Sequence, residues 1–310
     1  MISWQTWLLT VVAAVTIPLY VRILYVLIGH GKKCRLTSHF YTVTISQGLI
    51  DIAGFIVYYS CASMRGFEAL QPFYWSLNWT FFVQWSYVQT HLFEYGRILG
   101  IVMISIQRCS TVSFPFSRFN QVLISLPVWV FFAVHFLLPF ALCAGMFSEK
   151  MFYDNPSTTN VVIDAEVLEV FYMRSALIPL TGIAICTLCY SLIIRTVKNN
   201  VVHTRRSESR LCIQMVGLLL ALVFTSIHFS MQYIFNRLDM PQRVYTMRMY
   251  TPIWVGMLTF INPWMIILMN SELRRMTFCN NDLENHSLGS AVNPTSKASK
   301  NPSTKNLSRI

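Results

Sequence analysis

The stretch WLLTVVAAVTIPLYVRILYVLIG, residues 7–29, decides the class of fold. Its side chains are almost all apolar, and the only charge is on Arg22. About 20 such residues in a helix are long enough to cross the hydrocarbon core of a bilayer, which is about 30 Å thick. No basic segment precedes the run, and lysines and an arginine follow it within residues 32–35. We therefore expect a first transmembrane helix and not a cleaved signal peptide.

The rest of the chain has the same character. The 310 residues are 54% hydrophobic and only 12% charged, with a mean hydropathy of +0.48, whereas soluble domains carry about a quarter charged residues. An all-α membrane protein, a seven-transmembrane helix bundle, is predicted over residues 1–270, and a largely disordered tail rich in Ser, Asn, Lys and Thr over 271–310. The spans expected from the apolar runs are about 7–29, 40–62, 82–106, 122–144, 171–194, 211–235 and 249–270.

The basic residues predict how the bundle is oriented. With the C-terminus inside, sixteen of the 24 Lys and Arg lie in cytoplasmic segments and five in outer loops. This asymmetry follows the positive-inside rule, so we expect the N-terminus outside and the tail in the cytoplasm. The net charge of +11 then reflects topology and contact with anionic membrane lipids, and no nucleic acid is expected as a partner.

The motifs of common enzymes are missing. The sequence contains no H-E-x-x-H, no G-x-S-x-G and no phosphate-binding glycine loop. We therefore expect no enzyme activity, no cofactor and no metal site. Two modifications are conceivable from local motifs: N-glycosylation of Asn78 in the sequon Asn78-Trp79-Thr80, and palmitoylation of Cys279, just beyond the basic stretch ELRRMTF.

Ionisable side chains inside the spans are costly to bury and are therefore informative. Asp51 lies near the middle of the second span, where its short side chain cannot reach the headgroups, so we expect an interhelical polar network around it. Glu94 and Arg97 are three residues apart and share one face of the third span. They are expected to pair, either for structure alone or in contact with a ligand. The candidate ligand-contacting residues in the outer half of the bundle are His91, Glu94, Arg97, Arg174, His228 and Gln232.

The segment ISIQRCSTVSFPF, residues 104–116, resembles the end of helix three in rhodopsin-like G-protein-coupled receptors. In that family a D-R-Y motif is followed, seven positions after the arginine, by a proline. Gln107, Arg108, Cys109 and Pro115 stand at these positions, with glutamine and cysteine in place of the aspartate and tyrosine. The resemblance implies that these four residues couple the receptor to a G protein.

A second motif near the C-terminus points to the same family. Asn262-Pro263 in NPWMIILMN resembles the start of N-P-x-x-Y, although Ile266 replaces its tyrosine. Asp51 resembles the mid-membrane acid of helix two, so Asp51, Asn262 and Pro263 would form a polar network at a helix bend. The sixth span has no proline and the outer loops lack the usual cysteine pair, which makes an ordinary amine or peptide receptor a poor match.

Over residues 10–278 the chain resembles the nematode serpentine chemoreceptors, in particular the class V branch of their gamma superfamily. The stretches that carry the resemblance are TIPLYVRILYVLI, SQGLIDIAGFIVYY, SIQRCSTVSFPFS and INPWMIILMNSELR. It implies a chemosensory receptor in the plasma membrane of sensory cilia. Such a receptor binds an external small-molecule or pheromone-like cue and signals through a heterotrimeric G protein.

Two other classes of membrane protein fit the sequence less well. A ligand-gated channel like the insect odorant receptors has the opposite orientation, which the basic residues disfavour. A secondary transporter is expected to show inverted repeats or paired broken helices, and the sequence shows neither.

Overall fold

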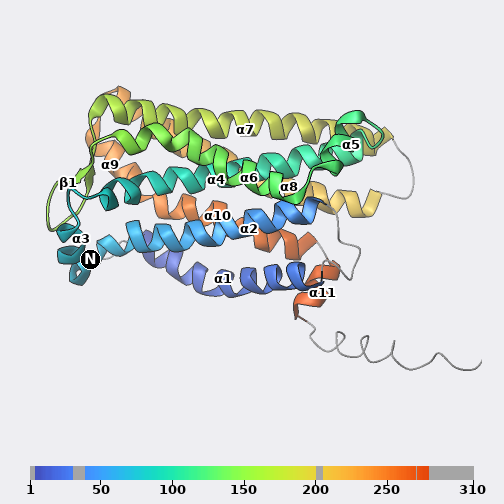
Figure 1. Cartoon of the computed structure of the whole chain (residues 1–310), viewed down its shortest axis with the longest axis horizontal. Coiled ribbons are helices and arrows are strands. Elements are labelled where there is room, and N and C mark those ends of the chain that lie inside the picture. The colour runs from blue at the N-terminus through green and yellow to red at the C-terminus, as the bar shows by residue number, and fades with distance from the viewer. Residues whose placement is uncertain (1–3, 31–38, 200–204, 270, 279–310) are drawn as a thin grey trace, which may run out of the picture.

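The computed structural model describes residues 4–30, 39–199, 205–269 and 271–278. Within these residues, long helices lie side by side and roughly parallel in an elongated bundle (Figure 1). They are α1 (Trp4–His30), α2 (His39–Tyr58), α4 (Phe81–Ser113), α6 (Val128–Cys143), α7 (Ala165–Asn199), α8 (Arg205–Arg237) and α10 (Thr251–Met269). Each expected span corresponds to one of these helices.

Short elements close the two ends of the bundle (Figure 1). One end, which we call the hairpin end, carries a two-stranded antiparallel hairpin in which Phe152 pairs with Val162 and Tyr153 with Val161. Its elements are η1 (Tyr59–Ser63), η2 (Met64–Gly66), η3 (Glu68–Leu70), α3 (Gln71–Ser76), η4 (Ala144–Ser148), β1 (Phe152–Tyr153), β2 (Val161–Val162) and α9 (Pro241–Met249). The opposite end, the α11 end, carries α5 (Arg118–Ser125) and α11 (Ser271–Phe278).

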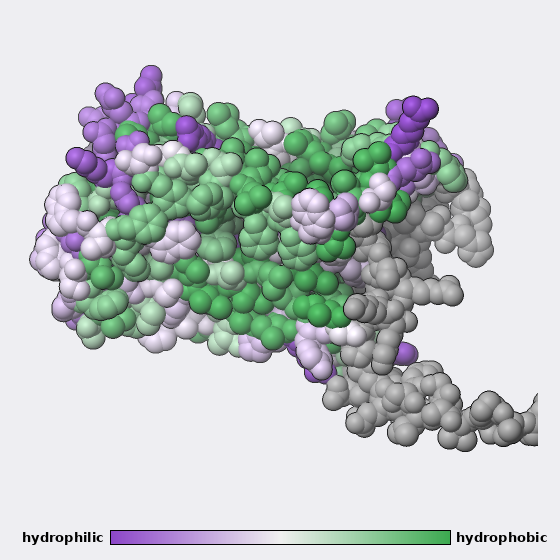
Figure 2. All heavy atoms as spheres, in the orientation of Figure 1, coloured by the Kyte–Doolittle hydropathy of each residue, from purple (hydrophilic) through white to green (hydrophobic). Residues whose placement is uncertain are grey.

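The bundle has the apolar surface that a membrane protein needs. On the face shown in Figure 2, hydrophilic side chains gather toward the two ends and hydrophobic ones cover the middle. Six segments of the described chain are long and apolar enough to cross a membrane: Trp4–Gly29, Tyr41–Gly66, Val128–Ser148, Ala165–Asn199, Val216–Arg237 and Pro241–Leu268. The 33-residue α4 is not among them, because its half nearest the hairpin end carries several polar side chains. Most of these face protein rather than lipid, since Gln89, His91, Glu94 and Arg97 are all buried.

The fourth span begins later than the sequence pattern predicts. We expected it over 122–144, but α6 starts at Val128, and residues 118–125 form the separate helix α5. The break falls at Leu126 and Pro127, which are both extended. The ring of a proline disfavours helical backbone at the residue before it, and a proline is well placed just ahead of a new helix.

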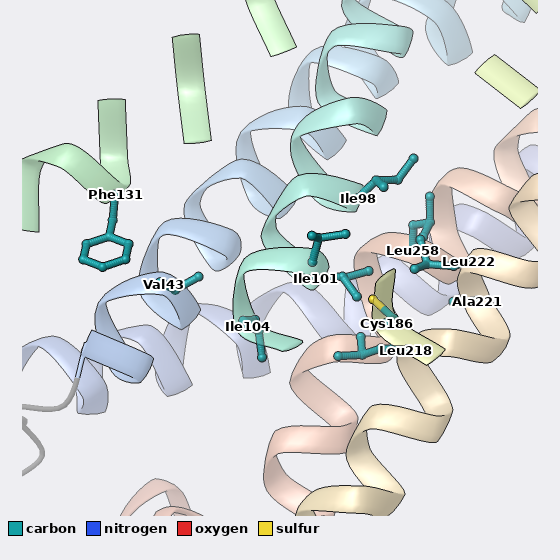
Figure 3. Close-up of a cluster of buried hydrophobic side chains, with 11 residues drawn as sticks. Val43, Ile98, Ile101, Ile104, Phe131, Cys186, Leu218, Ala221, Leu222 and Leu258 are labelled. Carbon is teal, nitrogen blue, oxygen red and sulfur yellow. The ribbon is translucent and has the colours of Figure 1, made fainter. Parts of the chain in front are cut away.

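A buried apolar cluster joins six of the seven long helices near the middle of the bundle (Figure 3). The helix α4 contributes the largest share, so it is the centre of the packing. The cluster consists of Val43 from α2, Ile98, Ile101, Val102 and Ile104 from α4, Phe131 from α6, Cys186 from α7, Leu218, Ala221 and Leu222 from α8, and Leu258 from α10. A movement of any of these helices would therefore change its packing against α4.

The closest approach of α2, α4 and α6 depends on Gly100. A Cβ at this position would lie 1.6 Å from Gln47 Oε1 and 2.7 Å from His135 Nε2. Neither side chain is free to move away. Gln47 Nε2 donates to Asp51 Oδ1 at 3.1 Å, and the ring of His135 is held between Ser46 Oγ at 2.8 Å and the Gly96 carbonyl at 2.9 Å.

We expect Gly100→Ala to destabilise the protein by about 1–3 kcal/mol, because forcing a methyl group into a packed core displaces its neighbours. The measurement is the thermal unfolding midpoint of the detergent-solubilised protein. Gly29→Ala in α1 is the matched control, since a Cβ there meets nothing within 4 Å and alanine favours a helix over glycine. A Gly100→Ala midpoint equal to the wild-type value would contradict this packing.

Candidate ligand pocket and polar core

The described residues line an open cavity of about 370 Å³ at the hairpin end of the bundle. Every long helix except α6 contributes to its wall, namely α1, the end of α2, α4, α7, α8 and α10. The short elements η1, η2 and α9 and the hairpin complete it. Pockets of roughly 300–1,000 Å³ are typical of sites for small molecules. The cavity therefore has the size and the shared walls of a small-molecule site.

The lining combines aromatic and uncharged polar side chains. The aromatic side chains are Tyr58, Tyr87, Tyr172, Phe229 and Tyr245. The uncharged polar side chains, apart from those in the hairpin, are Thr6, Ser63, Ser86, Thr90, His91, Gln232 and Thr251. Such a mixture suits an organic molecule with an apolar body and a few polar groups.

The tip of the hairpin, residues 158–161, forms part of the wall. Asn78 fixes the hairpin from outside, because its Nδ2 donates to the Tyr153 carbonyl at 3.2 Å and its Oδ1 accepts from the Tyr153 amide at 2.8 Å. The rings of Trp79 and Phe152 stack beside this contact with centroids 4.5 Å apart. A glycan on Asn78 would attach to Nδ2, the atom that makes the first of these bonds.

Two arginines, Arg65 and Arg248, line the cavity. Both are among the five basic residues predicted in outer loops, and neither was predicted to contact a ligand. Arg65 lies just beyond α2, and its guanidinium carbon is 5.5 Å from the centre of the Tyr153 ring. Its Nε and Nη1 atoms are buried and make no hydrogen bond. Arg248 lies in the last turn of α9 and donates from Nε to the Tyr172 hydroxyl at 2.6 Å. The sequence feature that could have identified them is their position, because each lies next to an end of an expected span.

Two of the six predicted ligand residues, His91 and Gln232, line the cavity. His91 Nδ1 lies 2.9 Å from Ser175 Oγ, which in turn lies 3.1 Å from the Tyr95 hydroxyl. Gln232 Nε2 lies 2.6 Å from His228 Nε2, so His228 supports the wall from behind. These two residues can contact a ligand and are oriented by buried neighbours.

The other predicted ligand residues lie outside the lining. Glu94 lies one helical turn beyond His91, with Oε2 3.7 Å from His91 Nδ1, and its two carboxylate oxygens are buried without a hydrogen bond. Arg174 is exposed on the surface of α7. Arg97 belongs to a different group of residues, deeper in the bundle.

The expected pair of Glu94 and Arg97 does not form, because Arg97 turns to Asp51 instead. Arg97 Nε lies 3.4 Å from Asp51 Oδ1, and both side chains are almost fully buried. Arg97 Nη2 also donates to the Asp51 carbonyl at 3.4 Å. The helices can approach this closely because Gly54 faces the arginine: a Cβ there would lie 2.7 Å from Arg97 Nη2.

The network predicted around Asp51 thus joins four helices. Tyr20 of α1 donates to Asp51 Oδ2 at 2.6 Å, and Asn262 of α10 donates to the same tyrosine hydroxyl at 2.8 Å. Tyr20 was not among the predicted residues. Pro263 follows Asn262 inside α10, so the polar core is adjacent to a point where the helix lacks one backbone hydrogen bond.

The four predicted coupling residues lie at the α11 end. Gln107 and Cys109 are buried, whereas Arg108 is partly buried. Cys109 packs against Cys189 and Ile193 of α7. The loop beyond is held by Asn120, an unpredicted residue, whose Nδ2 donates to the Pro115 carbonyl at 2.8 Å and whose Oδ1 accepts from Ser110 at 3.0 Å. Cys279 lies outside the described residues.

Together these features define a class of protein. A membrane bundle with a cavity at one end, a buried ionic core and an arginine at the other end has the parts of a transmembrane receptor. The sequence matches the family described as "Serpentine type 7TM GPCR chemoreceptor Srv" over residues 9–281. The chain therefore belongs to this family of seven-transmembrane chemoreceptors, as the sequence motifs predicted, and is a multi-pass membrane protein. A comparison with curated proteins gives no match.

No cluster of three or more His, Cys, Asp or Glu suited to a metal ion occurs in the part of the chain that the structure describes.

Proposed function

We propose that this chemoreceptor binds an external small molecule or pheromone-like cue in the cavity at the hairpin end and signals through a heterotrimeric G protein. The N-terminus and the hairpin end face outward, the tail lies in the cytoplasm, and the receptor resides in the plasma membrane of sensory cilia. The observation that carries the proposal is the position of the cavity, at the end of the bundle opposite Arg108. Family membership supplies the class of protein.

The helices that line the cavity also reach the opposite end of the bundle. Residues of α4, α7 and α8 contact the cavity, and the same helices continue past the apolar cluster to the α11 end. A ligand that fits one arrangement of these helices better than another shifts the population toward that arrangement. Pro263 lets α10 bend next to the Asp51 network, which lies between the two ends.

At the cytoplasmic end, Arg108 meets the G protein in the active arrangement. The basic residues between Arg195 and Arg210 add contact surface on the same side. In this chain the residue before Arg108 is glutamine, so position 107 does not supply the carboxylate that the aspartate of a D-R-Y motif places beside the arginine.

The experiment is expression of the receptor in cells with a reporter for cAMP, cGMP or calcium, followed by a panel of small molecules. We expect a ligand-evoked change that disappears when the G proteins are inactivated. Epitope tags on the two termini of intact cells test the orientation. A ligand-evoked current that persists without G proteins would instead indicate a channel, uptake of the molecule would indicate a transporter, and an accessible C-terminus would overturn the proposed topology.

We expect measurable basal signalling from the wild-type receptor and a lower basal level from Gln107→Asp. The new carboxylate would hold Arg108 in the inactive state, and partly buried pairs of this kind are worth about 1 kcal/mol or more, a several-fold shift in population. Gln107→Glu places the same charge one methylene further out and serves as the comparison. Basal signalling that is unchanged in Gln107→Asp, at equal surface expression, would contradict this account of the arginine.

A further inference from the structure

We infer that the cavity is built for an anionic ligand, a small molecule with a carboxylate or a comparable acidic group that Arg65 and Arg248 bind. This inference rests on the proposed function, because it names the chemical class of the cue that the receptor detects. It comes from the charges around the cavity.

The charges in the lining have one sign. Arg65 and Arg248 both line the cavity, and none of the described residues that line it is an aspartate or a glutamate. Glu94, whose carboxylate has no hydrogen bond, lies beside His91 but outside the lining, and two other acidic side chains at the hairpin end are engaged with other groups. Glu169 accepts from Arg237 at 2.6 Å, and Asp154 accepts from Asn160 and Thr158 inside the hairpin. An anion would therefore meet attraction in the cavity without a competing carboxylate in its wall.

Arg65 has unused hydrogen-bonding capacity in a buried place. Its Nε and Nη1 atoms are shielded from solvent and have no acceptor. Burying the donors of a charged group without an acceptor is unfavourable, and most such groups in native proteins have a partner. An acidic group in the cavity would supply acceptors in the paired geometry that suits the planar guanidinium.

Neighbouring aromatic rings position both arginines without neutralising them. The guanidinium carbon of Arg65 lies 5.5 Å from the centre of the Tyr153 ring, and that of Arg248 lies 5.7 Å from the centre of the Tyr172 ring. The Tyr172 hydroxyl also accepts from Arg248 Nε. Each arginine is thus positioned by a ring that carries no carboxylate.

The remaining lining fits the rest of such a molecule. Tyr58, Tyr87, Tyr245 and Phe229 offer apolar surface for a hydrocarbon or aromatic body. An amphiphilic acid is therefore a better match than an inorganic anion, which would leave this apolar surface unused. It is also a better match than a cationic amine, which the two arginines would repel.

The test is a binding assay on the purified full-length receptor in detergent, read out as the thermal unfolding midpoint. The probes are sodium octanoate and sodium indole-3-acetate, each paired with its neutral amide of the same size, octanamide and indole-3-acetamide. We expect at least one of the two acids to raise the midpoint with increasing concentration, because a ligand that binds the native state stabilises it. The paired amide should raise it much less.

Substitutions at the two arginines locate the binding site. Arg65→Gln and Arg248→Gln should each weaken the response to the acid by about tenfold or more, the usual scale for losing one charge-assisted contact. Arg243→Gln is the matched control: it removes the same charge from the same helix α9, outside the lining. Should a glutamine variant fail to fold, Arg65→Lys and Arg248→Lys keep the charge and should retain part of the response.

Two outcomes overturn the inference. One is that neither acid stabilises the receptor more than its amide. The other is that the acids stabilise Arg65→Gln and Arg248→Gln as well as they do Arg243→Gln. Failure of the proposed function is a separate result, because the thermal unfolding midpoint does not depend on a G protein. Acids that bind without evoking signalling would contradict the G-protein proposal alone. Neutral cues that evoke signalling, while no acid binds, would contradict the anionic ligand alone.

Discussion

Asp51→Leu is expected to lower the stability of the receptor by about 3–5 kcal/mol, the usual cost of removing one partner of a buried ion pair. The substitution leaves Arg97, which is 2% exposed, without the carboxylate 3.4 Å away. It also removes the acceptor of the Tyr20 hydroxyl and of Gln47 Nε2. The measurements are the thermal unfolding midpoint in detergent and the fraction of receptor that reaches the cell surface.

A double-mutant cycle separates the ion pair from the loss of packing. Arg97→Met should also be destabilising, because it leaves Asp51 as the uncompensated charge. The double variant Asp51→Leu/Arg97→Met should be less destabilised than the sum of the two single variants, since no unpaired charge remains. The control pair is Glu169 and Arg237, whose side chains are 32% and 67% exposed, and exposed pairs contribute only about 0–1 kcal/mol.

The cycle also has a result that would contradict the structure. If Asp51→Leu and Arg97→Met were additive, the two charges would not interact, and the polar core would not depend on their contact. Single variants with nearly wild-type stability would lead to the same conclusion. The control pair shows whether the assay can distinguish a small coupling energy from zero.

Arg108→Gln is expected to reduce ligand-evoked G-protein signalling by about tenfold or more while the receptor still reaches the surface. The reason is that a contact made only in the active complex contributes to coupling and not to folding, and loss of a charge-assisted contact costs about 1.5–3 kcal/mol. The measurement is the second-messenger response per receptor at the surface. Arg118→Gln is the matched control, since Arg118 is an exposed basic residue of α5 at the same end of the bundle.

Because Arg108 is partly buried, a conservative variant keeps this prediction testable. Arg108→Lys retains the positive charge and should fold, yet it lacks the planar group of arginine and should signal less well than wild type. A full response from Arg108→Gln at normal surface expression would remove Arg108 from the coupling site. An equally large loss of response in Arg118→Gln would show that any basic residue at this end of the bundle supports coupling equally well.

Local sequence reasoning succeeded where the physics is local. Whether a run such as residues 7–29 can cross a membrane depends on its own length and hydropathy, and this needs no knowledge of its neighbours. The spacing of Arg108 from Pro115 and the pair Asn262-Pro263 are likewise local, and the family that they indicated is the family that the chain matches. The late start of α6 could also have been read from Pro127.

Local reasoning failed where two helices had to meet. A spacing of three residues places Glu94 and Arg97 on one face of α4 and allows them to pair, but it does not say which other helix that face touches. The structure shows that Arg97 faces α2, where Gly54 makes room for its guanidinium and Asp51 offers a carboxylate. An opposite charge on a neighbouring helix replaced the expected partner on the same helix.

Hydropathy and short motifs act within single segments, so they were enough to predict a helical membrane receptor of the serpentine chemoreceptor type. The side chains that surround the cavity come from separate segments, and their meeting depends on the tertiary structure. Arg65 and Arg248 are 183 positions apart in the chain, and they line one cavity because α2 and α10 both end at the hairpin end. The packing of whole helices brings the two arginines together, and no pattern within one segment of the sequence encodes this proximity.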